Sequence, residues 1–295
     1  MIINYINISL KYFLLVLIGF SKCLYLKDGN NSNIIISKLA FGSCFNGFGY
    51  KRFEIFESIL NNNPDIFVWL GDVAYLDEFN FSLIFGSVPP FSKENAIKKF
   101  DETYNEKHYS LFRNKTFITG IWDDHDYSYN NAKKGSPYKQ TVKELFLNFL
   151  ETPKDSVRRT TDEKGIYTSF SIGESYKKVK IILLDLRYEQ TERTDSEENM
   201  MSEEQWEWLD NELSTGNETY TIIGSGIQFL NNIGFSWTEK WYNSSRIRLF
   251  ELIAKHKRQG VFIISGDVHR AEVSVTPCIH SSNYIYYNKT TIFKS

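Results

Sequence analysis

Carboxylates and imidazoles recur in three short motifs along this chain of 295 residues. Gly71-Asp72 comes first, Asp123-Asp124-His125-Asp126 follows, and Gly266-Asp267-Val268-His269 comes last. Two metal ions that act together on a phosphoryl group lie about 3.5 to 4 Å apart, which requires a carboxylate that can bridge them. Taken singly, each motif is more typical of a turn or of a hydrogen-bonded structural histidine. Together and in this order they indicate a two-metal site, with Asp72 as the candidate bridge.

Polar motifs follow short runs of β-branched and aromatic residues, which predict strands. The runs are Lys38–Phe41, Ile66–Leu70, Phe117–Trp122, Lys180–Leu184, Tyr220–Ile223 and Val261–Ile264. Open α/β sheets place their ligands at the carboxyl ends of strands. We therefore expect the three motifs to meet at one edge of a sheet.

Amphipathic stretches with helical periodicity lie between these runs. They are Phe53–Asn61, Glu94–Ser110, Val142–Leu150, Ser202–Leu213 and Ser244–Arg258. Within the fourth stretch, Ser202 and Gln205 have the spacing of a capping box that opens a helix. The alternation of strands and helices predicts a layered α/β domain, and the length of the chain favours a single catalytic domain.

The N-terminal residues have the pattern of an export signal. Lys11 precedes the apolar stretch Tyr12–Phe20, and Ser21 and Cys23 are small residues of the kind found at a cleavage site. The alternative, a transmembrane anchor, needs roughly 20 apolar residues, and this stretch is much shorter. We expect a signal peptide over residues 1–23, a linker over 24–36, a catalytic domain over 37–295, and no membrane span once the signal is removed.

Composition limits the partners and suggests the compartment. A formal net charge of -2 and the absence of a separate basic run argue against nucleic acid. Export would make the chain a secreted protein or one of the secretory pathway, where Asn-x-Ser/Thr sequons become glycosylated. The sequons begin at Asn30, Asn80, Asn114, Asn217, Asn243 and Asn288, and in an Asn-rich chain many arise by chance.

Seven motifs resemble, in order, those of the PhoD-like alkaline phosphatases, a family of the calcineurin-like metallophosphatase superfamily. They are Phe41-Gly-Ser-Cys44, Gly71-Asp-Val-Ala-Tyr75, Trp122-Asp-Asp-His-Asp126, Leu184-Asp-Leu-Arg-Tyr188, Glu204-Gln-Trp-Glu-Trp-Leu209, Gly224-Ser-Gly-Ile-Gln228 and Ser265-Gly-Asp-Val-His269. The resemblance implies a four-layer αββα fold with two mixed sheets. It also implies hydrolysis of phosphate monoesters or diesters by metal-activated water.

The resemblance assigns roles to residues that match the motifs. One metal would be held by Cys44, Asp72, Tyr75 and Asp267, and a second by Asp72 together with Asp124. His125 would act on the phosphate or its leaving group, with Asp126 orienting the imidazole. The remaining roles fall on Asp123 as a ligand or a support, His269 beside the metals, Arg187 as a fork for phosphate oxygens, and Gln228 where related enzymes often carry a ligand.

Ligand chemistry indicates which metals these residues would select. Tyr75 can be a ligand only as phenolate, which needs a strong Lewis acid at neutral pH, and the soft thiolate of Cys44 also disfavours calcium and magnesium. Ferric iron is the first candidate for this position and zinc the second. The position built from Asp72 and Asp124 offers hard oxygen ligands, which fit calcium best and magnesium next.

Several alternatives remain open at the level of sequence. Counting cysteines alone favours a disulfide between Cys44 and Cys278 in an exported protein, but the strand-end position of Cys44 beside Asp72 and Tyr75 reverses that preference. Ser128 and the pair Asn130-Asn131 stand where the family usually has a Gly and an Asn-Asp pair, so one carboxylate is missing. Residues 276–295 do not match the family's closing strands, which leaves a truncated C-terminal end open.

These departures favour an exported binding or scaffold protein without turnover as the alternative function. The apolar segment Phe79–Phe91 is either a substrate wall over the site or a surface insertion.

Overall fold

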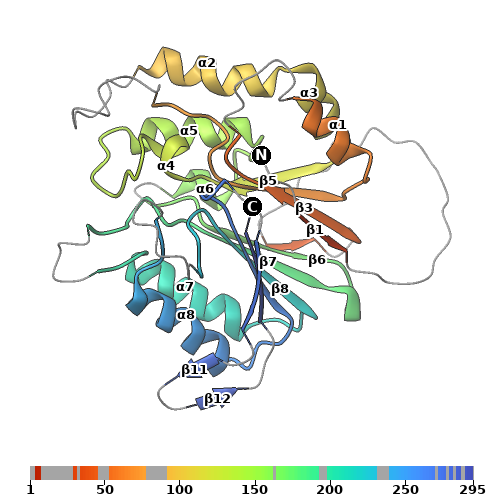
Figure 1. The fold of residues 1–295 in the computed structure, drawn as a ribbon, viewed down its shortest axis with the longest axis vertical. Coiled ribbons are helices and arrows are strands. Elements are labelled where there is room, and N and C mark those ends of the chain that lie inside the picture. The colour runs from red at the N-terminus through yellow and green to blue at the C-terminus, as the bar shows by residue number, and fades with distance from the viewer. Residues whose placement is uncertain are drawn as a thin grey trace.

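Two mixed β-sheets pack face to face between layers of helices in the computed structural model (Figure 1). It describes residues 4–7, 29–31, 34–45, 53–77, 92–161, 164–192, 198–230, 239–269, 272–276, 279–281, 284–286 and 290–294. The αββα layering with two mixed sheets confirms the expected fold class.

The strands and helices alternate along most of the chain. The strands are β1 (Asn4–Asn7), β2 (Gly29–Asn31), β3 (Lys38–Gly42), β4 (Ile66–Leu70), β5 (Phe117–Ile121), β6 (Thr168–Ile172), β7 (Val179–Leu184), β8 (Tyr220–Ser225), β9 (Val261–Ser265), β10 (Glu272–Thr276), β11 (Ile279–Ser281), β12 (Tyr284–Tyr286) and β13 (Thr290–Lys294). The helices are α1 (Glu54–Leu60), α2 (Lys93–Tyr104), α3 (Lys107–Arg113), α4 (Asp124–Tyr127), α5 (Lys139–Phe149), α6 (Val157–Thr160), the 3₁₀ turn η2 (Ser175–Lys177), α7 (Glu203–Ser214) and α8 (Asn243–Lys255).

The first sheet has the strand order β1-β3-β4-β5, and the second has the order β10-β13-β9-β8-β7-β6-β2. Within the first, β3, β4 and β5 are parallel and β1 is antiparallel to β3. Within the second, β7, β8, β9 and β13 are parallel, while β6 and β10 run against their neighbours β7 and β13. Each sheet therefore has a parallel centre whose strands end on the same edge.

Strand β7 shows why the central strands are apolar without interruption. Ile181 and Leu183 pack into the core between the two sheets, whereas Ile182 and Leu184 pack against α7 and α8. Successive side chains of a strand point to opposite faces, so a strand covered on both sides must be apolar at every position. The sequence cannot distinguish such a run from a buried helix by periodicity, but its short length favours a strand.

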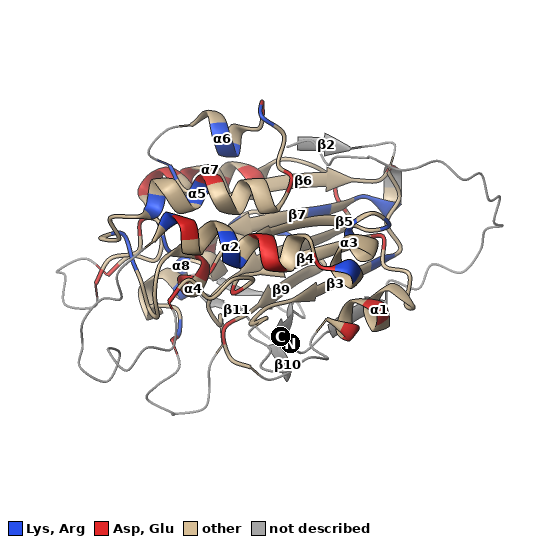
Figure 2. Ribbon diagram, turned by 90° about the horizontal axis from the view of Figure 1, so that it is seen from above, with Lys and Arg blue, Asp and Glu red and all other residues tan. Residues whose placement is uncertain are grey.

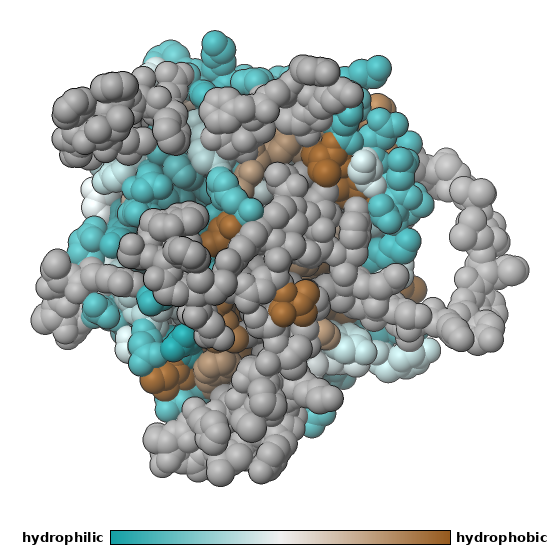
Figure 3. Space-filling model, viewed as in Figure 1, coloured by the Kyte–Doolittle hydropathy of each residue, from teal (hydrophilic) through white to brown (hydrophobic). Residues whose placement is uncertain are grey.

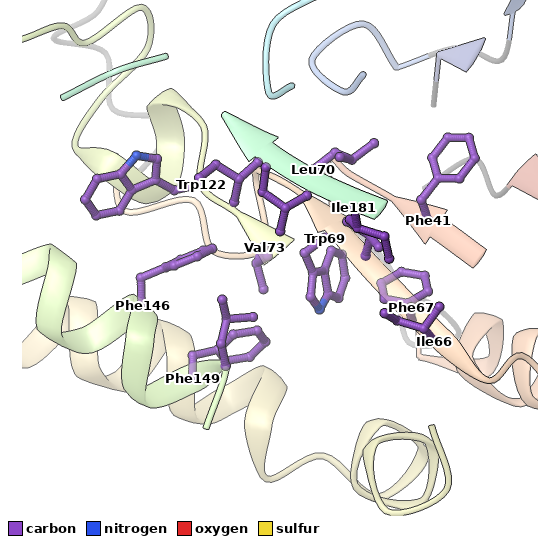
Figure 4. Packing of buried hydrophobic residues seen from close by; sticks show 14 of the residues in the cluster. Phe41, Ile66, Phe67, Trp69, Leu70, Val73, Trp122, Phe146, Phe149 and Ile181 are labelled. Atoms are coloured by element: carbon purple, nitrogen blue, oxygen red, sulfur yellow. The ribbon is translucent and has the colours of Figure 1, made fainter. Parts of the chain in front are cut away.

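Aromatic residues fill the layer between the first sheet and its helices. Trp69 and Phe67 of β4 lie near Phe149 of α5 and Phe112 of α3, and Phe112 stacks on Phe56 of α1 at 5.6 Å between ring centroids. Figure 4 shows Trp69, Phe146 and Phe149 pointing toward one another between the sheet and the helix. This packing holds β4 and β5 in place, and both strands end at the polar motifs.

The predicted helices agree with the structure except for one. The stretch Glu94–Ser110 divides into α2 and α3, because the side chain of Glu106 caps α3 by accepting from His108 N at 2.6 Å and Tyr109 N at 3.0 Å. Ser202 caps α7 as expected, accepting from Gln205 N at 3.2 Å. The side chain of Gln205 does not complete a capping box, since it bonds with the backbone of Asp185 instead.

Some segments for which the sequence made a prediction lie outside the described residues. These are the apolar stretch Tyr12–Phe20, the whole segment Phe79–Phe91, and Cys278. The predicted signal peptide and its cleavage after Cys23 stay predictions, and β1 falls within that segment. Among the residues that can be described, no helix is both long and apolar enough to cross a membrane.

Residues beyond Val275 supply a strand that their sequence did not predict. Strand β13 lies between β9 and β10, parallel to the first and antiparallel to the second. It covers the edge of β9, which would otherwise expose its backbone hydrogen-bonding groups. Edge closure, which the sequence left open, is thus provided by residues 290–294.

The described surface carries mixed charge and scattered apolar residues. Figure 2 shows acidic and basic residues interspersed along α2. On the face in Figure 3, apolar residues reach the surface in several separate patches. The exposed large apolar side chains, among them Ile35, Leu111 and Val157, come from different parts of the chain.

Replacement of Phe112 by Ala should test the aromatic layer. Phe112 is fully buried against the rings of Phe56 and Phe67, so its loss should lower the free energy of unfolding by about 3–5 kcal/mol. Leu111→Ala on the same helix is the control, because Leu111 is 47% exposed and its loss should cost less than about 1 kcal/mol. Urea denaturation of both variants measures this. Equal losses in the two variants would contradict this packing of Phe112.

Candidate metal centre

The ends of six parallel strands converge at one edge of the sandwich. The loops that follow β3, β4 and β5 face those that follow β7, β8 and β9, since Gly226 lies against Asp123 and Gly266 lies against Leu70. Backbone hydrogen bonds join neighbouring loops, with Cys44 N donating to Gly71 O at 3.3 Å and Gly266 N donating to Gly226 O at 3.0 Å. The motif residues predicted from sequence therefore belong to one site built from both sheets.

Two glycines, one from each sheet, let the strand ends approach closely around Asp123. Gly71 has φ +90°, and a Cβ there would lie 2.2 Å from the Cβ of Asp123. A Cβ at Gly226, in the opposite sheet, would lie 2.6 Å from Asp123 Oδ1. Any larger residue would push the two strand ends apart.

Four candidate residues adopt a left-handed backbone, which is uncommon for residues other than glycine. Their φ angles are 55° at Cys44, 56° at Asp72, 76° at Asp267 and 41° at His269. Such conformations cost free energy and persist only where the surrounding structure fixes them. Here they turn side chains from three strand ends toward a common centre.

Asp72 belongs to two groups of potential metal ligands. One group consists of Cys44, Asp72 and His269, and the other of Asp72, Asp124 and His125. Within each group the ligand atoms lie within 4.8 Å of one another. A shared carboxylate between two ligand groups is the arrangement that a bridged metal pair requires.

Tyr75 extends the first group. Its hydroxyl lies 3.5 Å from Asp72 Oδ2 and 3.3 Å from His269 Nε2. The Cys44 thiol lies 3.6 Å from the same oxygen of Asp72, and Cys44 is a buried free cysteine. Thiol, phenol and imidazole thus surround one carboxylate oxygen, and Cys44 is a free cysteine rather than half of the disulfide that cysteine counting favoured.

Burial makes these groups hard to ionise without a cation. Burial and the charge of Asp124 raise the pKa of Asp72 well above its usual range, and burial and the charge of Asp123 do the same for Asp267. Burial, followed by the charge of Asp72, also raises the pKa of the Tyr75 hydroxyl and of the Cys44 thiol. Each would hold its proton unless a cation took the proton's place.

Unpartnered oxygens show that the residues fit a metal pair. Among the described residues, buried carboxylate oxygens of Asp72, Asp123, Asp124 and Asp267 have no hydrogen-bond donor. Buried polar atoms are nearly always satisfied, so a group of bare carboxylate oxygens indicates a cation that they would coordinate. The amide of Gln228 is also fully buried and unpartnered in this part of the chain.

Arg187 lies inside the carboxylate cluster rather than at its surface. Its Nε lies 2.5 Å from Asp123 Oδ1, one terminal nitrogen lies 2.5 Å from Glu239 Oε2, and the other lies 3.6 Å from Asp124 Oδ1. Burial raises the pKa of Asp124, but Arg187 and His125 outweigh it and hold that pKa below its usual value. Asp124 therefore stays ionised and ready to bind a cation.

His125 bonds to a residue that the sequence motifs did not single out. Its Nδ1 lies 2.6 Å from Asp77 Oδ1. Burial lowers the pKa of His125, but this bond and the charges of Asp124 and Asp72 raise it to about 10. Because a carboxylate can only accept, Nδ1 carries the proton and Nε2 is left for other contacts.

Asp126 makes contacts different from those expected of it. One of its oxygens accepts from Ala74 N at 2.8 Å and the other from Asp123 N at 3.3 Å, completing a capping box at the start of α4. The contact that was expected to orient His125 comes from Asp77 instead. The reason is helical geometry, since adjacent residues of a helix do not face each other.

The comparisons with known proteins agree with this geometry. The sequence model of the PhoD-like phosphatases matches residues 39–290. The chain belongs to the PhoD-like phosphatase family. A solved structure described as "Structure of PhoD" aligns with a TM-score of 0.64 at 17% identity, over 92% of this chain and 58% of the other. At this identity the likeness establishes the fold alone, and the chain spans little more than half the length of that protein.

A second solved structure aligns with a TM-score of 0.42 at 11% identity, over 85% of this chain and 88% of the other. A search of curated proteins found no match.

Within this PhoD-like chain, most residues named from sequence gather at the centre. Cys44, Asp72, Tyr75 and His269 lie together, as do Asp72, Asp124 and His125. Asp267 lies near enough to Asp123 and Asp124 for their charges to raise its pKa.

Asp123 supports the site through its pair with Arg187. Arg187 was expected to grip phosphate with its planar fork, and the structure differs, because the guanidinium is fully buried among carboxylates of the protein.

Asp77 and Glu239 are the site residues that sequence reasoning missed. Asp77 follows Tyr75 by two positions, so an acidic residue so close to a motif could have been flagged. Glu239 lies in a segment without periodicity, and only the folded chain brings it to Arg187.

Replacement of Arg187 by Met should show what this guanidinium does. The variant would leave buried carboxylates without their cation, so we expect a loss of roughly 3–5 kcal/mol in the free energy of unfolding of metal-free protein. Arg248→Met is the matched control, since its pair with Glu203 is exposed and should contribute no more than about 1 kcal/mol. Thermal and urea denaturation measure both. Unchanged stability with a raised KM would favour the phosphate fork instead.

Proposed function

We propose that this protein hydrolyses phosphate esters at a pair of metal ions held where the two sheets meet. The observation that carries the proposal is the position of Asp72, which belongs to both groups of potential ligands. Membership of the PhoD-like phosphatase family supports the same chemistry.

Each side of the site has a separate task in this proposal. Cys44, Tyr75 and Asp267 would hold one ion with Asp72, and Asp124 would hold the second with the same carboxylate. Bound cations would supply the positive charge that activates an attacking water molecule and neutralises the phosphoryl oxygens. Arg187 and the strained backbone turns keep the carboxylates in place before any ion arrives, so little rearrangement is needed on binding.

His125 is the candidate for proton transfer. Its side chain is 18% exposed, so it can reach a substrate, whereas the carboxylates of Asp123 and Asp124 are almost wholly buried. With Nδ1 bonded to Asp77, the ring can hold or release a proton at Nε2 near the leaving group. His269 lies on the other side of Tyr75, and burial together with the charge of His125 lowers its pKa, so it is neutral and able to act as a ligand or acceptor.

Asn130 and Asn131, where the chain departs from the family motif, still contribute hydrogen bonds to the site. The backbone N–H of Asn131 donates to Asp124 Oδ2 at 2.5 Å, and that of Asn130 donates to Asp77 Oδ2 at 2.9 Å. These positions therefore act through their backbone. A protein with the same fold that binds without turnover is the alternative, and an assay on aryl phosphate monoesters and diesters, with and without chelator, separates the two.

Replacement of Asp72 by Asn should abolish the two-metal site while keeping the fold. An amide is a neutral and poorer bridging ligand, so turnover of p-nitrophenyl phosphate or its diester should fall by orders of magnitude. Chelator should do the same to the unaltered protein. Asp65→Asn is the control, because Asp65 lies at the opposite end of β4 and bonds to Ser37 and Lys38. Near-normal rates with full metal content would remove Asp72 from this role.

Donor types favour ferric iron on the side of Cys44 and Tyr75, with zinc as the second choice. Both groups have raised pKa values in the protein, so only a strongly acidic ion would displace their protons. On the side of Asp124, hard oxygen ligands favour calcium and then magnesium.

Replacement of Tyr75 by Phe should test the iron assignment through colour. A phenolate bound to ferric iron absorbs visible light by charge transfer, so the protein should be coloured and the variant should lose or shift the band. Tyr109→Phe is the control, since this buried tyrosine bonds to Trp69 away from the site. Absorption spectra and metal analysis measure the effect. A colourless, fully active protein containing only zinc would contradict the iron assignment.

Export to the secretory pathway or beyond the cell belongs to the same proposal. It rests on the predicted signal peptide and on the sequons, of which those at Asn114, Asn217 and Asn243 lie at exposed positions. Glycosidase treatment of protein from a eukaryotic host tests the sequons, and N-terminal sequencing tests cleavage after Cys23.

A further inference from the structure

Asp77 is a buried carboxylate that joins two loops of the site. Its side chain is 1% exposed and follows β4, whereas its partners belong to α4 and the residues just after it. We propose that Asp77 is the positioning residue of His125, fixing the imidazole so that Nε2 is the nitrogen presented to the reacting phosphate group. This inference rests on the proposed function and adds to it a residue that the motifs did not identify.

Both oxygens of Asp77 are engaged by the facing segment. Oδ1 lies 2.6 Å from His125 Nδ1, and Oδ2 accepts from the backbone N–H of Asn130 at 2.9 Å. The second bond holds the carboxylate at a fixed rotation, which gives the first bond a fixed direction. The imidazole is therefore aligned by a group that is itself held in place.

Further contacts confine the ring of His125. Leu76 N donates to the backbone carbonyl of His125 at 3.2 Å, which fixes the Cα from which the ring extends. The ring of Tyr75 lies against the imidazole, with 4.3 Å between ring centroids. Because the ring is held by the hydrogen bond to Asp77 and by this aromatic contact, rotation about either side-chain bond of His125 would break at least one of the two interactions.

The tautomer follows from the chemistry of the partner. An ionised carboxylate has no proton to donate, so Nδ1 must be the protonated nitrogen. An amide at position 77 could keep the bond to Asn130 through its oxygen and present its NH₂ to the imidazole. Nδ1 would then be forced to accept, and the proton of a neutral ring would move to Nε2.

A purely structural role for Asp77 is the rival explanation, because the bond to Asn130 also anchors the loop after α4. The two roles differ in how the effect depends on His125. A positioning residue loses its influence on turnover when the ring is absent, whereas an anchor keeps it.

Turnover of p-nitrophenyl phosphate by four full-length proteins separates these roles. They are the unaltered protein, Asp77→Asn, His125→Ala and the double variant. We expect Asp77→Asn to lower kcat by about 10- to 100-fold, with KM and metal content little changed. In the double variant, Asp77→Asn should lower kcat no further than His125→Ala does alone. An equal drop in both backgrounds would overturn the proposal in favour of the anchor.

A matched control shows that the effect is local. Asp65→Asn replaces another carboxylate that accepts backbone hydrogen bonds, at the far end of β4, and should lower stability without lowering kcat. If Asp65→Asn lowers kcat as much as Asp77→Asn does, the loss reflects general destabilisation and the proposal fails.

The protonation of the ring gives a readout that does not depend on turnover. Nitrogen-15 NMR of zinc-loaded protein should show His125 protonated at Nδ1. The signal of His125 is identified by its absence from the spectrum of His125→Ala. In Asp77→Asn this signal should be shifted. A proton on Nε2 alone in the unaltered protein would overturn the proposal even if Asp77→Asn does not fold. Protonated Nδ1 without turnover in the unaltered protein would refute the proposed function while leaving the positioning of His125 intact.

Discussion

Negative charge concentrated in a buried place is the constraint on which this site depends. Asp72, Asp123, Asp124 and Asp267 lie at the ends of β4, β5 and β9, and burial opposes the ionisation of each. Among the described residues, Arg187 is the buried guanidinium that meets this cluster, and it reaches two of those carboxylates and Glu239. The oxygens left bare are those that cations would bind. Folding of the metal-free chain and binding of metal are thus linked, because both concern how the same charges are neutralised.

The two sheets supply the rigidity that such a cluster needs. Their central strands are covered on both faces, and the aromatic layer behind β4 holds the strand that leads to Asp72. Glycines at the strand ends allow the sheets to come within contact of Asp123, and left-handed turns then direct the ligands inward. The cost of these conformations is offset by the packing of the strands themselves. A pre-formed site of this kind requires little movement when substrate binds.

Two aspartates near His125 have different roles because they occupy different positions in the fold. Asp126 is next to His125 in sequence but faces away from it, and it closes the first turn of α4. Asp77 is far from His125 in sequence but faces its ring across the gap between two loops. The nearer residue stabilises the local backbone, while the distant one sets the direction and protonation of the imidazole.

The sequence alone determined the layered fold, the strand ends and most of the candidate metal ligands. It could do so because short apolar runs with polar residues at their ends are local patterns, and the motifs follow those runs directly. Only the tertiary structure decided the partners: Asp77 for His125, Glu239 for Arg187, and β13 beside β9. These pairings join residues distant in the chain, and no local periodicity encodes which buried charge will meet which. Hydrogen-bond direction and charge compensation depend on the folded arrangement, and for that reason they had to be observed.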